Sequence, residues 1–323
     1  MHGRNRRWTL IDARYQRRGR GLAGLTGYCE SVSTVGPDPS RQWALYRCGF
    51  PDVWPVLDTG PDPGEIAVID RGEKGLNHRE LAGRITRKPE PSCTSRAAHA
   101  AAVAAVIAAR RDDHEWDADG RMDGCCSARV RVYSAWDANE RFDLGAVRAA
   151  LFEVAQLKLP VVNLSLSISL PNQRDLDDAI ATCVRNGVVV VAAMGSGNDP
   201  DDGPIYPAAN PNVIAVGATN MEDRPASGSN RGAHIWLSAP GESILTVIGD
   251  DPFDYKYLSG SSFAAAMVTA AVWLARRKKP GLTPGDVREL LRLSAYRPDG
   301  IPGHDSEIGH GRLDMKRLGE LLR

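Results

Sequence analysis

The sequence lacks long apolar runs and has no excess of charge of either sign. Its apolar stretches are broken within about ten residues, whereas a membrane-spanning helix needs roughly 18. Lys and Arg number 40, and Asp and Glu also number 40. A membrane span is therefore not expected, and the charge gives no support to nucleic-acid binding. The hydrophobic fraction of 42 % among 323 residues instead suits a globular domain with a substantial core.

Cysteine is also scarce and shows no metal-binding spacing. The six cysteines are scattered along the chain and include no CxxC pair. The basic N-terminal region is not followed by an apolar segment of the kind found in export signals. We therefore expect reduced thiols and a cytoplasmic location.

The composition changes near residue 64. Residues 1–63 are rich in Arg, Gly and Pro and contain no long periodic pattern, which predicts an N-terminal extension. Residues 64–323 alternate short β-branched runs with Ala-rich helical stretches. This alternation predicts an α/β domain with a mostly parallel central sheet and helices on both faces.

The expected elements can be placed from apolar runs and helical periodicity. Strands are predicted at 66–69, 129–133, 161–166, 188–193 and 213–216. Helices are predicted at 98–110, 144–157, 176–186, 262–278 and 283–293. Gly187 stands where a helix-terminating glycine is expected after the third of these helices.

Three polar residues stand where an α/β sheet collects catalytic groups. Asp70 ends an apolar strand, and His99 begins an Ala-rich helix. Ser262 begins an apolar helix, where free N–H groups favour negative charge. Each also has a purely structural interpretation, as a turn aspartate, a packed histidine and a serine helix cap. Only their combination points to nucleophilic catalysis.

The combination resembles the subtilisin family of serine proteases over most of the sequence. VIDRGEKGLNHREL resembles the family's strand and turn around its aspartate, HAAAVAAVIAA its histidine helix and GSSFAAAMV its serine helix. The resemblance implies a three-layer subtilisin-like fold. It also implies that Asp70, His99 and Ser262 form a triad in the family's chain order. No cofactor is required for that chemistry.

Flanking motifs imply the remaining site residues. VVNLSLS resembles the strand that pairs with the substrate backbone, and NGVVVVAAMG resembles the strand that ends at the oxyanion hole. By this resemblance the substrate-binding residues are Ser165, Leu166, Ser167, Gly195 and Ile205. The oxyanion donor is Asn198 if two residues are inserted after the strand and Ser196 if none are, in each case with the amide of Ser262. Ser167 and Ile168 stand where glycines are usual, which narrows the cleft. Ile205 resembles a position at the floor of the primary pocket that small residues often fill, so we expect a shallow pocket that prefers small side chains.

The motifs also depart from the family pattern. Ala100, Ala101 and Ala102 replace a glycine, a threonine and a second histidine in the histidine motif. Ala266 and Met267 replace a proline and a histidine after the serine. The three alanines at 100–102 take no part in proton transfer, so these replacements are expected to alter packing more than chemistry. The replacements at 266 and 267 are expected to loosen a turn beside the nucleophile.

The loop at 110–126 is acidic and lies where many relatives carry a calcium loop. Asp117, Asp119 and Asp123 are candidate oxygen ligands for a structural calcium ion. Their spacing matches no EF-hand, and a solvated acidic loop is the alternative interpretation. The adjacent cysteines of the same loop lack the spacing of a zinc site.

The sequence therefore predicts a serine endopeptidase of restricted specificity, acting in the cytoplasm on a peptide or protein substrate. One alternative is a catalytically weak or inactive protein of the same fold that binds a peptide or partner. Another is a signalling protease activated by a partner that docks on the Arg-rich N-terminal region. Nucleic acid and membranes are not expected partners.

Overall fold

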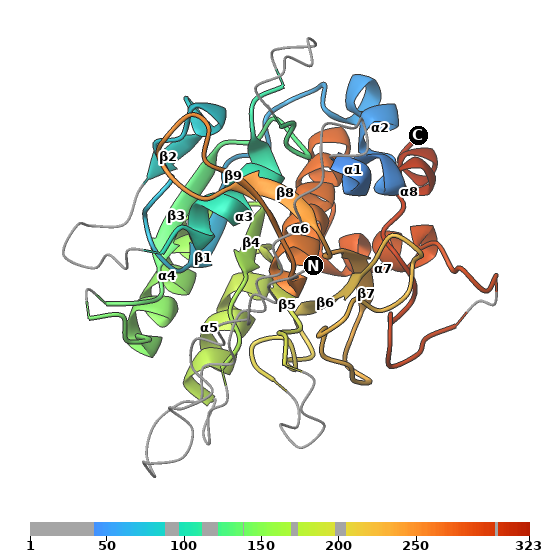
Figure 1. Cartoon of the computed structure of the whole chain (residues 1–323). Helices are drawn as coiled ribbons and strands as arrows, with labels where there is room; N and C mark the ends of the chain where they lie inside the picture. Colours follow the sequence, from blue (N-terminus) through green and yellow to red (C-terminus); the bar gives the residue numbers. More distant parts are fainter. Residues whose placement is uncertain are drawn as a thin grey trace, which may run out of the picture.

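The centre of the molecule is a seven-stranded sheet (Figure 1). The computed structural model describes residues 42–87, 97–111, 122–137, 139–168, 174–197, 205–300 and 303–323. The strand order is β2-β3-β1-β4-β5-β6-β7, and every pairing is parallel. The strands are β1 Ile66–Asp70, β2 Ile85–Arg87, β3 Val130–Ser134, β4 Val161–Leu164, β5 Val189–Ala193, β6 Ile214–Thr219 and β7 Leu237–Pro240. The predicted α/β class with a mostly parallel sheet is confirmed.

Burial on both faces explains why the strands read as apolar runs. Every residue of β1, β4, β5, β6 and β7 is buried. Successive side chains of a strand point to opposite faces of the sheet. In β1, Ile66 and Val68 join one core, whereas Ala67 and Ile69 join the other.

Helices cover both faces and complete three layers (Figure 1). Helices α3 and α6 pack in the first core, and α4 and α5 pack in the second. Their bounds are α3 His99–Ala108, α4 Leu144–Leu157, α5 Arg174–Arg185 and α6 Ser261–Lys278. Helix α6 contacts four strands of the sheet and is buried along most of its length, which explains its nearly all-apolar sequence.

A β-hairpin and two C-terminal helices complete the domain. They are β8 Ile244–Val247, β9 Tyr255–Leu258, α7 Pro284–Ser294 and α8 Met315–Leu321. Strand β8 packs against α3, which therefore lies between the sheet and the hairpin. This enclosure explains why every residue of α3 after the first is buried and why the helix shows no polar face.

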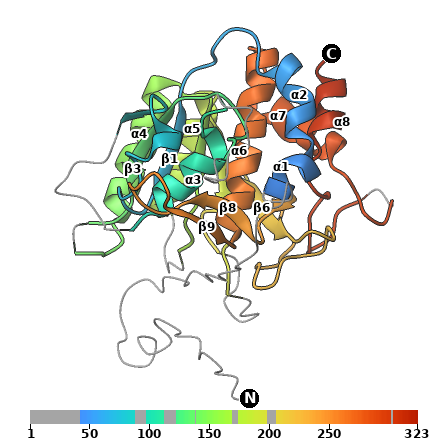
Figure 2. The same ribbon diagram turned by 45° about the horizontal axis from the view of Figure 1, so that its top comes forward.

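The region before residue 64 includes two short helices that are built into the fold. Helices α1 (Trp43–Cys48) and α2 (Phe50–Leu57) join the first core, and α2 lies beside α8 (Figure 2). The buried carboxylate of Asp58 then accepts the Ser127 hydroxyl at 2.6 Å and pairs with Arg277 at 3.1 Å. Residues 1–41 lie outside the described part of the chain.

All five predicted strands and all five predicted helices are present, with ends shifted by up to three residues. Sequence patterns did not predict the short elements α1, α2, α8, β2, β7 and the β8–β9 hairpin. In the described ranges, no helix is both long and apolar enough to cross a membrane.

Candidate active site

Asp70 is the last residue of β1 and is completely buried. Its Oδ1 accepts the main-chain N–H of Arg71 at 2.5 Å. The chain then turns at Gly72, whose φ of +85° lies in the left-handed region that favours glycine. A Cβ on Gly72 would overlap the carbonyl group of Ala97. The turn after the aspartate therefore lies directly against the segment that leads into α3, and Ala100 N–H donates back to Arg71 O at 3.0 Å.

His99 is the first residue of α3, and it faces Asp70. The two side chains meet through His99 Nδ1 and Asp70 Oδ1, 2.5 Å apart. The imidazole is 9 % exposed, and the ring of Phe263 lies with its centroid 6.1 Å away. A carboxylate at Nδ1 holds the proton there and makes Nε2 the basic nitrogen. The histidine is thus oriented as a general base requires.

Ser262 is the second residue of α6 and directly precedes Phe263, which contacts His99. Helices α3 and α6 pack against each other, and the alanines at 100–102 and 264–266 are all buried. Small side chains let two helices approach closely. The alanines that replace other residues of the family motifs are among these buried residues, so they lie where the two helices pack. The fold therefore places Asp70 of β1 in contact with His99 of α3 and brings the first turn of α6, which contains Ser262, beside His99 through the ring of Phe263.

Gly195 follows the end of β5 and is hydrogen-bonded to the first residue of α6. Its φ is +83°, and its carbonyl accepts the Ser261 hydroxyl at 3.1 Å and the Asn230 N–H at 3.2 Å. Ser196, one of the two predicted oxyanion donors, follows in a short β-bridge. Asn198, the other, lies outside the described residues. The segment that contains the predicted oxyanion hole is therefore bonded to the residue before Ser262.

The predicted substrate-binding segment follows β4 and also reaches α6. The Ser165 hydroxyl donates to the carbonyl oxygen of Ser262 at 3.2 Å. Leu166 is buried. Ser167 faces Gly195, because a Cβ added to the glycine would lie 3.2 Å from Ser167 Oγ. The two segments predicted to line the primary pocket therefore approach each other closely.

A further pairing brings Ile205 to the end of this segment. Ile168 and Tyr206 exchange two main-chain hydrogen bonds of 2.8 and 3.2 Å. The side chains of Ile168 and Ile205 are both buried. All five residues predicted to bind substrate therefore lie on segments that are bonded to one another or to the start of α6.

Asn230 also contacts the site, although no sequence motif marks it. Its side-chain Nδ2 donates to Met194 O at 3.1 Å, and its main chain donates to Gly195 O. Both bonds hold the turn that contains Gly195. Asn230 lies in a loop between β6 and β7 that carries no motif, so only the tertiary structure reveals its contact with the site.

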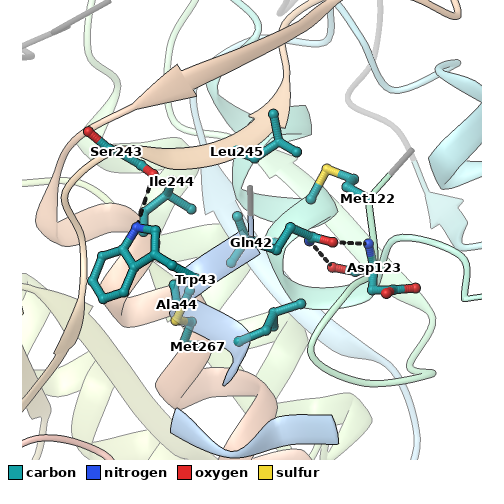
Figure 3. A pocket seen from close by; sticks show the side chains of 11 residues that line it. Gln42, Trp43, Ala44, Met122, Asp123, Ser243, Ile244, Leu245 and Met267 are labelled. Atoms are coloured by element: carbon teal, nitrogen blue, oxygen red, sulfur yellow. Dashed lines mark hydrogen bonds between the residues drawn. The ribbon is translucent and has the colours of Figure 1, made fainter. Parts of the chain in front are cut away.

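A calcium site stays a prediction. Asp117 and Asp119 lie outside the described residues, and the described residues contain no group of three or more His, Cys, Asp or Glu side chains placed to hold a metal ion. The main chain of Asp123 exchanges two 2.8 Å hydrogen bonds with the Gln42 side-chain amide (Figure 3). This pair borders a mostly apolar pocket between α1, α3, β8 and α6, whose lining includes Met267 and none of the catalytic candidates.

Comparison with known proteins agrees with this arrangement. The model of the subtilase family matches residues 56–311. The minor extracellular protease Epr of Bacillus subtilis is 29 % identical over 289 residues, which cover 88 % of this chain and 43 % of that protein. The thermophilic serine proteinase of Bacillus sp. strain AK1 is 30 % identical over 269 residues, covering 81 % of this chain and 62 % of that protein.

A solved structure shows the same fold. Fervidolysin from Fervidobacterium pennivorans, a keratinolytic enzyme related to subtilisin, aligns with a TM-score of 0.76 at 22 % identity over 93 % of this chain and 51 % of that one. This chain spans less than two thirds of the length of both Bacillus proteins. The family match nevertheless includes Asp70, His99 and Ser262 and covers most of the sequence. The chain therefore belongs to the subtilase family.

Proposed function

We propose that this protein is a serine endopeptidase that acts through Asp70, His99 and Ser262. The observation that carries the proposal is the 2.5 Å contact between His99 Nδ1 and the buried Asp70, beside the first turn of α6, which contains Ser262. Ser262 Oγ attacks the scissile carbonyl while His99 Nε2 takes its proton. The proton then passes to the leaving amine as the C–N bond breaks. Water attacks the acyl-enzyme in the same way and releases Ser262.

Negative charge on the carbonyl oxygen is stabilised in this mechanism by hydrogen-bond donors. The main-chain N–H of Ser262 is one, at the start of an 18-residue helix whose dipole favours negative charge. Ser196 or Asn198 supplies the other. Loss of one such donor typically costs about 10²–10³ in rate.

Restricted specificity forms part of the proposal. The close approach of Ser167 to Gly195 and the buried side chains of Ile168 and Ile205 support a shallow primary pocket. Substrates with Ala before the cleaved bond are expected to be hydrolysed faster than matched substrates with Phe there. Comparison of kcat/KM for the two substrates tests this, and a clear preference for Phe would contradict it.

We also propose that the enzyme acts inside the cell on a small set of peptides or proteins. The four cysteines among the described residues, at 48, 125, 126 and 183, are buried free thiols, which suits a reducing compartment. Immunoblotting of cytoplasmic and exported fractions tests the location. Recovery of the protein only from the exported fraction would refute it.

Labelling with a fluorophosphonate tests the proposed nucleophile. The wild-type protein should be labelled, and the Ser262→Ala variant should not. Ser294→Ala is the matched control, because it removes a buried hydroxyl in α7 that donates only to Leu291 O. Folded wild-type protein that resists labelling would indicate the alternative of a fold that binds peptides without an activated serine.

A further inference from the structure

Asn163 is a fully buried polar residue in the apolar strand β4. Its neighbours in register are Val68 of β1 and Val191 of β5. A buried amide that made no hydrogen bonds would be strongly destabilising. Both ends of the Asn163 side chain are bonded, and the bonds lead to the proposed nucleophile.

Three successive hydrogen bonds connect Thr269 to Ser262, and each donor lies on the Thr269 side of its bond. The Thr269 hydroxyl donates to Asn163 Oδ1 at 3.0 Å. Asn163 Nδ2 donates to Ser165 Oγ at 2.8 Å. Ser165 then donates its own proton to Ser262 O at 3.2 Å. The side chains of Thr269, Asn163 and Ser165 are at most 2 % exposed, so water does not compete for these bonds.

The spacing of residues along helix α6 and strand β4 explains why these hydrogen bonds can form. Ser262 and Thr269 are seven residues apart, which is nearly two turns, so they lie on the same face of α6. Asn163 and Ser165 are two residues apart and point to the same side of their extended segment. Helix α6 packs against β4. The two pairs therefore face each other, and the hydrogen bonds span the first two turns of the helix.

The hydrogen bond from Thr269 supports one orientation of the amide. The Thr269 hydroxyl donates to Asn163 Oδ1, and Nδ2 then points to Ser165 as a donor. In the flipped amide, Ser165 would donate to Asn163 Oδ1 and no longer to Ser262 O. Resting on the function proposed above, we propose that Thr269 and Asn163 are positioning residues that hold Ser262 through the Ser165 hydroxyl.

The test compares Thr269→Val with Thr269→Ser. Valine keeps the shape of threonine and removes the proton that orients Asn163, whereas serine keeps that proton. Thr269→Val is expected to lower kcat and the rate of fluorophosphonate labelling by about tenfold, with KM within about twofold of wild type, because displacements below 1 Å at reacting groups have effects of this order. Thr269→Ser should restore both rates to within about twofold. Ser165→Ala removes the hydroxyl that accepts from Asn163 and donates to Ser262 O, and it should lower kcat and the labelling rate as Thr269→Val does.

Thr246→Val is the matched control. Thr246 is an equally buried threonine in β8, and its hydroxyl donates to Ala102 O of α3 at 2.7 Å rather than to a residue of the Asn163 network. This variant should lose thermal stability and keep its kcat. The proposal is overturned if Thr269→Val loses stability but labels at the wild-type rate, or if Thr269→Ser fails to restore labelling.

Failure of the proposed function would be recognised separately. Absence of labelling in the wild type would refute the activated serine. The positioning role of Thr269 and Asn163 would then be tested by a measurement that needs no activity. Amide hydrogen exchange at 261–266 should then be faster in Thr269→Val than in Thr246→Val. Equal exchange in the two variants would overturn the proposal.

Discussion

Replacement of Gly72 by Ala is expected to lower kcat by about 10²-fold. The added Cβ would overlap the carbonyl of Ala97 and lie 2.9 Å from the Ala97 Cα. These are main-chain atoms, so the turn after Asp70 and the segment before His99 must separate by about 1 Å, a displacement that can cost about 10² in rate. The separation also strains the hydrogen bond from Ala100 to Arg71. The left-handed backbone of Gly72 adds about 1–2 kcal/mol of destabilisation for any residue with a Cβ.

Gly83→Ala separates these two effects. Gly83 has a φ of +71°, and no atom lies within 4 Å of a Cβ added there. It should therefore show a similar conformational cost without displacing the site. The assay measures kcat on a peptide substrate and the free energy of unfolding by denaturant titration for both variants. Equal kcat values in Gly72→Ala and Gly83→Ala would refute the argument that this turn sets the distance between Asp70 and His99.

Three further predictions concern the primary pocket, the buried thiols and the ion pair between Asp58 and Arg277. Ile205→Gly should raise kcat/KM for Phe relative to Ala substrates by at least about tenfold, and an unchanged ratio would place Ile205 outside the pocket. Burial raises the pKa of Cys126 and Cys183 to about 12. Each is then only about 10⁻⁴ thiolate at pH 8, so iodoacetamide should alkylate them only after denaturation, as peptide mass spectrometry can show. Asp58→Ala leaves Arg277 without its buried carboxylate and should lower the free energy of unfolding by about 3 kcal/mol in a denaturant titration; a loss below about 0.5 kcal/mol would show that this ion pair is dispensable.

The sequence predicted the central sheet well because burial on both faces leaves a local signal. A parallel strand covered by helices must be apolar along its whole length, and β5 shows this as an unbroken run of Val and Ala. Asp70 and His99 were identified for a related reason. A polar residue that ends such a run, or begins an apolar helix, stands out against its neighbours.

The missed elements lack that contrast. Helix α2 has eight residues and contains Pro55, so its local propensity is poor and its helical state depends on packing against α8 and α6. Strand β9, with the sequence YKYL, is mostly half-buried and contains a lysine. It becomes a strand by pairing with β8, which in turn packs against α3. Such stabilisation comes from partners that are distant in the chain.

The sequence by itself determined the fold class and the identity of the three catalytic candidates, because apolar runs and sequence motifs are patterns of neighbouring residues. Only the tertiary structure decided how Asn163, Thr269 and Asn230 contact the site. Thr269 lies 106 residues from Asn163, and the two meet because strand β4 and helix α6 pack at one register. Register between distant elements depends on the packing of the whole core and leaves no pattern in neighbouring residues.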